Sequence, residues 1–336
     1  MNRNRMADLL KGLAVIFMIQ VHLVELFATT DIYMSWIGKI SLFLGGPPAA
    51  PVFMVVMGYY FAMSKRTMKG GVIRGLKLIL LGFLLNVGLN LHLFIKIVNG
   101  SIVTSPWPYL FGVDILFLAG LSLIILSIVK HYFKLKLWPY VILLAFVFIV
   151  QIFDSSARQT GVLAYFKAYF MGDSIWWSYF PLIPWLAYPT AGFIFYIIKN
   201  QVDVSYKNYR SYLVLFSGII TIIFISYGVN ISAELSEYYH HGILFFLYTS
   251  CFLIFYAIGV EMITHMEGTW LSRWIEWLGI HVTAVYVIQW LLIGNIATTI
   301  YKTQGYGQLA FWFVVVLIVT SAGVLIWNRI KRFVSF

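Results

Sequence analysis

A lysine, a histidine and a glutamate lie in the first apolar segment of the chain, where their spacing could support chemistry. Lys11, His22 and Glu25 all fall within residues 8–25, a stretch otherwise apolar enough to enter a lipid bilayer. On an α-helix, eleven residues make three turns plus about 20°, so Lys11 and His22 share one face about 16 Å apart. Ionisable groups inside a membrane helix are costly and commonly mark a functional site. The pattern predicts a site that receives a long anionic molecule.

His22 is the candidate general base of this site. Glu25 follows it by three residues, and a carboxylate at that spacing can hold an imidazole in one tautomer near neutral pH. Counted from Leu9, His22 lies about 20 Å along the helix, in the outer half of a hydrocarbon core about 30 Å thick. The structural alternative is a neutral histidine that donates to a carbonyl group of a neighbouring helix. We predict His22 and Glu25 as catalytic residues.

The composition indicates an integral membrane protein. Of 336 residues, 61% are hydrophobic and only 10% are charged, and the mean hydropathy is +0.88. A soluble domain of this size carries about 25% charged residues. The net charge of +11 does not indicate nucleic-acid binding, because cytoplasmic loops of membrane proteins collect Lys and Arg. The single cysteine, Cys251, excludes an intrachain disulfide.

About ten apolar runs are long enough to span a bilayer. They cover residues 8–27, 47–63, 73–95, 110–129, 137–153, 180–198, 211–230, 243–262, 277–298 and 309–328. Most of the 23 Lys and Arg residues fall on one side of these runs, which predicts that both termini are cytoplasmic. We predict an all-α polytopic protein with a single membrane domain over residues 1–336. We expect it in a bacterial plasma membrane.

The first apolar run resembles the first helix of known transmembrane acyltransferases. Asp8-x-x-Lys11-Gly12-x-Ala14 followed by His22 is similar to the heparan-α-glucosaminide N-acetyltransferase-like proteins and to the related acyltransferase family 3. The second family carries an Arg-x10-His signature, matched here as Lys11-x10-His22. Lysine keeps the charge of arginine but loses the planar fork that grips phosphate. Further similar segments follow in the family's order: 45–53, 74–77, 112–116, 180–185, 279–286 and Gln289.

The resemblance implies an acetyl-CoA-dependent acyltransferase that acts on an extracytoplasmic acceptor, a sugar amine or hydroxyl of a glycan. The phosphates of acetyl-CoA are then expected at the cytoplasmic mouth, on Lys11, Lys65, Arg66, Arg74 and Lys77. His22 would either deprotonate the acceptor directly or carry the acetyl group as a covalent intermediate. Besides acetyl-CoA and the acceptor, we expect membrane lipids as partners, and the sequence is compatible with an oligomer.

Asp114 and Trp185 are candidate acceptor-binding residues. Asp114 also has a structural interpretation, as a carboxylate at a helix N-terminus, where the helix dipole favours negative charge. His240 and His241 lie near Glu234 and Glu237, but adjacent histidines point in different directions on a helix. We therefore predict no metal site.

A different class of function fits several of the same features. A proton-coupled secondary transporter of a small anion or sugar could use His22 and Glu25 as a proton relay. Such transporters commonly show inverted repeats with paired broken helices, and the sequence shows no such repeat. An inactive relative that serves as a membrane scaffold is a third alternative.

Overall fold

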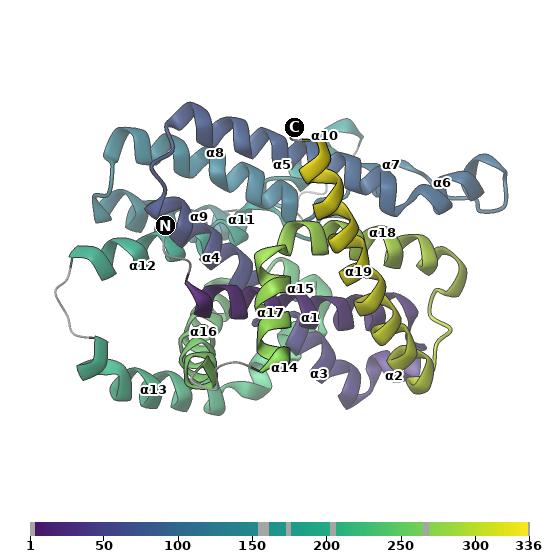
Figure 1. The fold of residues 1–336 in the computed structure, drawn as a ribbon. Coiled ribbons are helices and arrows are strands. Elements are labelled where there is room, and N and C mark those ends of the chain that lie inside the picture. The colour runs from purple at the N-terminus through teal and green to yellow at the C-terminus, as the bar shows by residue number, and fades with distance from the viewer. Residues whose placement is uncertain (1–3, 154–160, 173–175, 202–205, 265–268, 335–336) are drawn as a thin grey trace. The chain divides into compact units, whose positions relative to one another are not determined.

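The structure is a computed structural model that describes residues 4–153, 161–172, 176–201, 206–264 and 269–334. These residues are predominantly helical (Figure 1). Within these ranges the only β pairings are two isolated bridges, Ala28 with Gln304 and Val113 with Ser178. The predicted all-α fold class is therefore confirmed.

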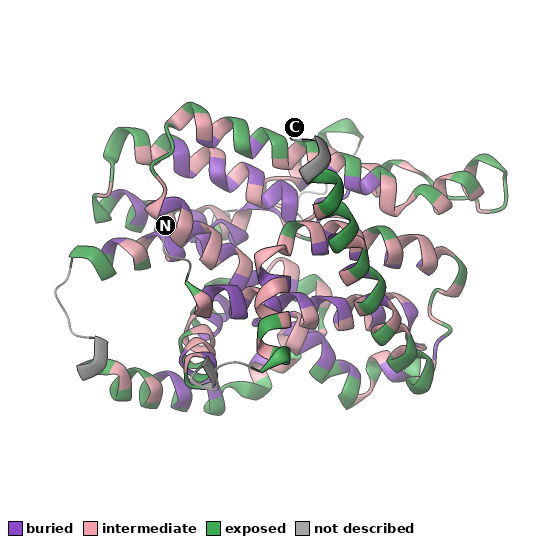
Figure 2. Cartoon of the chain, in the orientation of Figure 1, coloured by how far each residue is buried: buried purple, intermediate pink, exposed green. Residues whose placement is uncertain are grey.

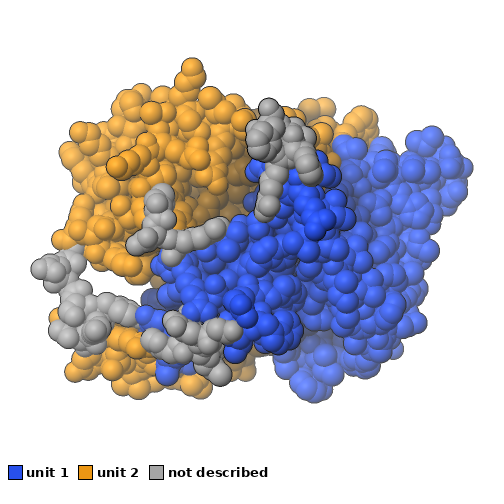
Figure 3. Space-filling view, viewed as in Figure 1, with its two compact units in different colours: residues 1–52, 87–106, 253–336 blue, residues 53–86, 107–252 orange. Residues whose placement is uncertain are grey.

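Contacts within the chain divide it into two compact units, and neither is continuous in sequence (Figure 3). Unit 1 comprises Met1–Val52, Val87–Pro106 and Leu253–Phe336, and unit 2 comprises Phe53–Asn86 and Trp107–Phe252. The helices of unit 1 are α1 (Arg5–Phe27), α2 (Thr30–Met34), α3 (Trp36–Gly45), α6 (Leu91–Val98), α17 (Trp270–Ile280), α18 (Val282–Ile300) and α19 (Tyr306–Val334).

Unit 2 holds most of the remaining helices. They are α7 (Trp107–Leu110), α8 (Ile115–Phe133), α9 (Leu137–Phe153), α10 (Val162–Ala168), α11 (Leu182–Trp185), α12 (Ala187–Gln201), α13 (Tyr206–Ile223), α14 (Ile225–Ala233) and α15 (Leu235–Tyr239). Three helices have residues in both units: α4 (Ala50–Met63), α5 (Met68–Leu89) and α16 (Ile243–Thr264). The single domain over residues 1–336 stays a prediction.

The described residues include eight helical segments that are long and apolar enough to cross a membrane. They are Arg5–Phe27, Trp36–Met63, Met68–Leu89, Ile115–Phe133, Leu182–Gln201, Ile243–Met262, Val282–Ile300 and Tyr306–Lys331. The pair α13–α14 would make a ninth span and is bent by 58°, and the apolar helix Leu137–Ile152 is shorter. Each of the ten predicted runs falls on one of these segments.

Several predicted runs do not form one continuous helix. The run 180–198 is divided at Leu186 between α11 and α12, and the run 211–230 is divided at Phe224 between α13 and α14. The run 73–95 is divided at Asn90 between α5 and α6, and the run 277–298 is divided at His281 between α17 and α18. Both residues depart from helical geometry, with ψ angles of 11° and 20°. The breaks are tolerated because backbone groups stay paired across them: the Asn90 carbonyl accepts from Phe94, and the His281 amide donates to Trp277.

The last helix shows why the fold needs a lipid environment. Most of α19 is exposed (Figure 2), and its exposed side chains are large and apolar. They include Phe311, Val314, Ile318, Leu325 and Trp327. An exposed apolar face of this length is stable against hydrocarbon, not against water.

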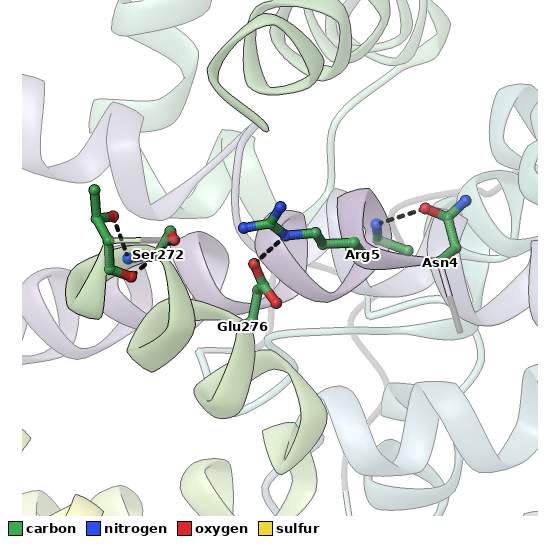
Figure 4. Close-up of polar contacts among 6 residues, drawn as sticks. Asn4, Arg5, Ser272 and Glu276 are labelled. Carbon is green, nitrogen blue, oxygen red and sulfur yellow. Dashed lines mark hydrogen bonds and ion pairs between the residues drawn. The ribbon is translucent and has the colours of Figure 1, made fainter. Parts of the chain in front are cut away.

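Helix α1 packs against α17 in unit 1, and glycines set how closely the two approach. A Cβ atom on Gly12 would lie 1.9 Å from the Ile275 carbonyl oxygen, and one on Gly279 would lie 1.8 Å from the Asp8 carbonyl oxygen. Small residues at such crossings let backbones approach closely in membranes. An ion pair between Arg5 and Glu276 joins the same two helices (Figure 4).

The opposite end of α1 is fastened to the turn between α18 and α19. The Lys302 amide donates to the Leu26 carbonyl at 3.0 Å, and the Gln304 amide donates to the Phe27 carbonyl at 2.8 Å. These bonds satisfy carbonyl groups that a helix C-terminus leaves unpaired. Helix α1 is therefore held at both ends within unit 1.

In unit 2, a lysine of α8 closes the end of α4. The Lys130 ammonium donates to the carbonyl oxygens of Phe61, Ala62 and Ser64 at 3.0, 2.9 and 2.6 Å. A cation at a helix C-terminus also complements the helix dipole. This contact fixes the start of the basic segment, residues 65–77, which follows α4.

We predict that Gly12→Ala lowers the stability of the folded protein. The added methyl group would overlap the Ile275 carbonyl oxygen, so α1 and α17 must separate, at a cost of about 1–3 kcal/mol. The measurement is the thermal unfolding midpoint in detergent. Gly259→Ala in α16 is the matched control, because its added Cβ would meet no atom within 4 Å. Equal midpoints for the two variants would contradict the close crossing.

Candidate functional site

His22 lies on α1 and is held by two consecutive residues of α18. Its Nδ1 atom is 3.3 Å from the side-chain amide of Gln289, which is only 1% exposed. The indole of Trp290 lies against the imidazole, with ring centroids 4.0 Å apart. The imidazole therefore has a fixed position inside unit 1.

The Gln289 amide contacts one ring nitrogen of His22. The amide oxygen and the amide nitrogen both lie 3.3 Å from Nδ1, and the amide nitrogen also lies 3.8 Å from Met18 Sδ, a weak acceptor. With the oxygen toward the ring, Nδ1 carries the proton and Nε2 is the basic atom. With the nitrogen toward the ring, Nδ1 is the basic atom.

Glu25 has a different neighbour from the predicted one. Among the described residues, no hydrogen bond joins Glu25 to His22, and the charge that acts on Glu25 is that of Lys302. The Lys302 ammonium also lies 3.9 Å from the centre of the Tyr33 ring. Burial lowers the pKa of Lys302, and the Glu25 carboxylate opposes that shift. The structure thus assigns the orientation of His22 to Gln289, whereas a catalytic role of Glu25 stays a prediction.

Lys11 forms an ion pair on its own helix. Its ammonium lies 2.7 Å from an Asp8 carboxylate oxygen, one turn earlier, and both side chains are mostly buried. Val15 and Met18, on the same helix face between Lys11 and His22, are buried in protein. The face that carries both ionisable residues therefore contacts other helices of the unit, and its role as a site stays a prediction.

The other predicted cofactor-binding residues lie in unit 2. Lys65, Arg66, Arg74 and Lys77 are all exposed, on the connection to α5 and on its first turns. Arg66 also lines a half-open pocket of about 210 Å³, together with Thr67, Lys130 and His131. Binding of coenzyme A phosphates by these residues stays a prediction.

The two predicted acceptor-binding residues have structural roles in unit 2. The Asp114 carboxylate caps α8, because it accepts from the Leu116 amide at 2.8 Å. Trp185 is fully buried, and its indole nitrogen donates to the Tyr239 carbonyl at 2.8 Å. Contact of either residue with an acceptor stays a prediction.

The structure thus brings Lys11, His22 and Glu25 together on one helix of unit 1, and it places the remaining predicted residues in unit 2. Sequence reasoning missed the roles of Gln289, Trp290 and Lys302. A buried amide in an apolar helix was the available signal for Gln289, since such a group needs a polar partner. Among the described residues, no group of three His, Cys, Asp or Glu side chains could hold a metal ion.

A second buried histidine lies in unit 2. His241 is 3% exposed, and its Nδ1 lies 2.7 Å from the Tyr238 carbonyl oxygen. A carbonyl only accepts, so Nδ1 carries the proton and Nε2 accepts from the Tyr188 hydroxyl at 3.0 Å. All polar atoms of the ring are satisfied in the neutral form. This pair holds α12 to the start of α16.

One family model matches residues 3–209, which is more than half of the chain. Its description is heparan-alpha-glucosaminide N-acetyltransferase, catalytic. The chain belongs to this family. The predicted resemblance to the heparan-α-glucosaminide N-acetyltransferase-like proteins is therefore confirmed. Comparisons with curated proteins and with solved structures find no match.

Family membership and the apolar helices together give the broad class of the protein. It is an integral multi-pass membrane protein of an acetyltransferase family. The matched region includes Lys11, His22, the basic segment, Asp114 and Trp185, whereas Gln289 and Trp290 lie beyond residue 209. The residues that hold the imidazole thus come from a part of the chain outside the match.

We predict that His241 makes the stability of the protein fall in acid. Burial lowers its pKa to about 4, whereas an unfolded histidine titrates near 6.5. Between these values the unfolded state binds more protons, so stability is complete above about pH 6.5 and falls by roughly 3 kcal/mol as pH decreases to 4. The measurement is the thermal midpoint from pH 7.5 to 4.5 for wild type and His241→Gln.

The variant should have a lower midpoint at pH 7.5 and a shallower dependence on pH. His131→Gln is the control, because it removes an exposed imidazole instead of a buried one. If His241→Gln keeps the pH dependence of the wild type, His241 is not the group responsible.

Proposed function

We propose that the protein transfers an acetyl group from cytoplasmic acetyl-CoA to an amine or hydroxyl group of an extracytoplasmic glycan. The observation that carries this proposal is the family match over residues 3–209, which contains the Lys11–His22 pair. The family's name specifies transfer to the nitrogen of a glucosaminide, so D-glucosamine is the first acceptor to test. The match also supports a transferase over the transporter alternative.

The proposed orientation places both termini in the cytoplasm. It rests on the excess of Lys and Arg in the loops of one side. In this orientation Lys11 and the segment 65–77 face the cytoplasm, which contains the acetyl-CoA. His22 lies in the outer half of the membrane. We expect a bacterial plasma membrane as its location.

The proposed chemistry is direct transfer with His22 as general base. The acceptor nitrogen or oxygen attacks the thioester carbonyl, and His22 Nε2 takes its proton. The carbon–sulfur bond then breaks, and the coenzyme A thiolate leaves and takes up the proton. In this proposal the Gln289 oxygen accepts from Nδ1, so that Nε2 is the basic atom throughout. Glu25, one turn further along α1, would accept a hydrogen bond from the neutral amine or hydroxyl group of the acceptor.

The donor would extend along α1 from Lys11 to the imidazole of His22. Lys11 would provide positive charge for its phosphates, and phosphate binding by Lys65, Arg66, Arg74 and Lys77 stays a prediction from the sequence. The distance along α1 between Lys11 and His22 is about 16 Å, which suits the extended pantetheine arm. Lys11 would exchange part of its ion pair with Asp8 for a phosphate oxygen.

We predict that His22→Ala lowers the rate of acetyl transfer by about 10²–10⁴-fold, because loss of a general base typically costs this much. The measurement is transfer of radiolabelled acetyl from acetyl-CoA to D-glucosamine by purified protein in proteoliposomes. Stabilisation by coenzyme A in a thermal assay should persist in the variant, since the imidazole does not contact the phosphates. A variant with the wild-type rate would exclude His22 as the base.

The covalent alternative is tested in the same preparation. Rapid quenching of wild type with acetyl-CoA in the absence of acceptor, followed by mass spectrometry, should show no acetylated His22. Acetylated His22 would replace direct transfer with a two-step mechanism.

We predict that Gln289→Leu lowers kcat without a comparable change in KM for acetyl-CoA. Leucine has no acceptor for the Nδ1 proton, so the tautomer with a basic Nε2 loses its preference. Gln289→Glu retains an acceptor oxygen and should restore most of the rate. The measurement is steady-state kinetics over a range of pH. Equal losses for Leu and Glu would show that Gln289 acts only through packing.

A further inference from the structure

A pocket beside the basic segment is lined mostly by side chains outside the predicted set of phosphate-binding residues. It lies in unit 2, where α4 ends, α5 begins and α8 passes, and it encloses about 210 Å³. Its lining includes Phe61, Arg66, Thr67, Ser127, Lys130 and His131. Of the predicted phosphate-binding residues, Arg66 belongs to this lining, and Lys65, Arg74 and Lys77 do not.

Two basic side chains of the pocket have donors to offer. Lys130 directs its ammonium to three carbonyl oxygens at the end of α4, so its hydrogen-bonding capacity is already used. Arg66 and His131, by contrast, have no hydrogen-bond partner among the residues that the structure describes. A guanidinium presents two parallel N–H groups to an oxyanion, and an imidazole adds a third donor.

The backbone of α5 adds to this positive field. Thr67 precedes the helix, and its hydroxyl accepts from the Gly70 amide at 3.2 Å. The amides of the first helical turn, at Met68 and Lys69, have no carbonyl partner within the helix. Met68 and Thr67 both line the pocket, so the positive end of the helix dipole faces it.

We propose that this pocket binds a phosphomonoester, the 3′-phosphate on the ribose of coenzyme A. This inference rests on the proposed function, because it takes coenzyme A as the donor's carrier. A phosphomonoester carries close to two negative charges at pH 7 and three terminal oxygens, and it matches a guanidinium and an imidazole donor beside a helix N-terminus. Each phosphate group of the diphosphate carries one negative charge and fits such a pocket less well.

The volume supports the same assignment. A pocket of about 210 Å³ holds a phosphate with the neighbouring part of a ribose, but not the whole nucleotide and its diphosphate. A lipid such as phosphatidic acid presents the same phosphomonoester chemistry, so the test must separate the two sources.

The test measures binding of coenzyme A and of dephospho-coenzyme A, which lacks the 3′-phosphate, by titration calorimetry in phosphatidylcholine nanodiscs. We expect wild type to bind coenzyme A at least tenfold more tightly. Arg66→Gln and His131→Gln should each reduce this ratio, and the double variant should bring it close to one. Both side chains are exposed, so the variants are expected to fold. Lys69→Gln is the matched control, because it removes the same charge from a residue outside the pocket and should keep the ratio.

Each contrary outcome overturns the inference in a distinct way. A wild-type ratio near one excludes a 3′-phosphate site. A high affinity ratio that Arg66→Gln and His131→Gln leave unchanged places the 3′-phosphate site elsewhere. If Lys69→Gln lowers the ratio as much as Arg66→Gln does, the preference for coenzyme A comes from general charge attraction and not from this pocket. Loss of coenzyme A binding in nanodiscs with phosphatidic acid, restored by Arg66→Gln, assigns the pocket to lipid. Because binding is measured without turnover, absence of acetyl transfer with an intact ratio would refute the proposed reaction and leave this site standing.

Discussion

A polar group inside a membrane protein must find a partner within the protein, and this constraint shapes the candidate site. His22 meets it through Gln289 of α18, and Lys11 meets it through Asp8 one turn away. In the hydrocarbon layer no water replaces a missing partner, so these contacts decide which helices must lie together. The position of α18 beside α1 is therefore as much a consequence of one imidazole as of apolar packing.

The same constraint acts at the helix ends of both units. In unit 1 the last carbonyl groups of α1 accept from the backbone of Lys302 and Gln304. In unit 2 the last carbonyl groups of α4 accept from the Lys130 side chain. Backbone amides therefore pair the last carbonyl groups of α1, whereas a side chain pairs those of α4. The Lys130 side chain places a positive charge at the start of the basic segment. Because Lys302 uses its backbone amide, its side chain can face Glu25 and Tyr33.

Much of the fold follows from the sequence, because the spans are set by local hydropathy and the shared face of Lys11 and His22 by helix geometry alone. Contacts between distant segments do not follow in this way. Gln289 is 267 residues from His22, and no local sequence pattern predicts which helix packs against α1. The breaks at Asn90 and His281 were missed for a related reason, since both residues lie in runs whose hydropathy favours one continuous helix. Glu25 was paired with His22 on spacing, whereas its charge acts on a lysine from a turn near the end of the chain.

The two attachments of α1 have a mechanical consequence. Its first half lies in backbone contact with α17 at Gly12, and its last residues are bonded to the turn at Lys302 and Gln304. A helix clamped in this way cannot slide along its axis to meet a substrate. The helix itself sets the separation between Lys11 and His22, and the two attachments keep both residues at a constant height in unit 1. In the proposed reaction, a carrier with a shorter or longer arm would present its reactive carbon away from the imidazole, so the scaffold itself would select among thioesters.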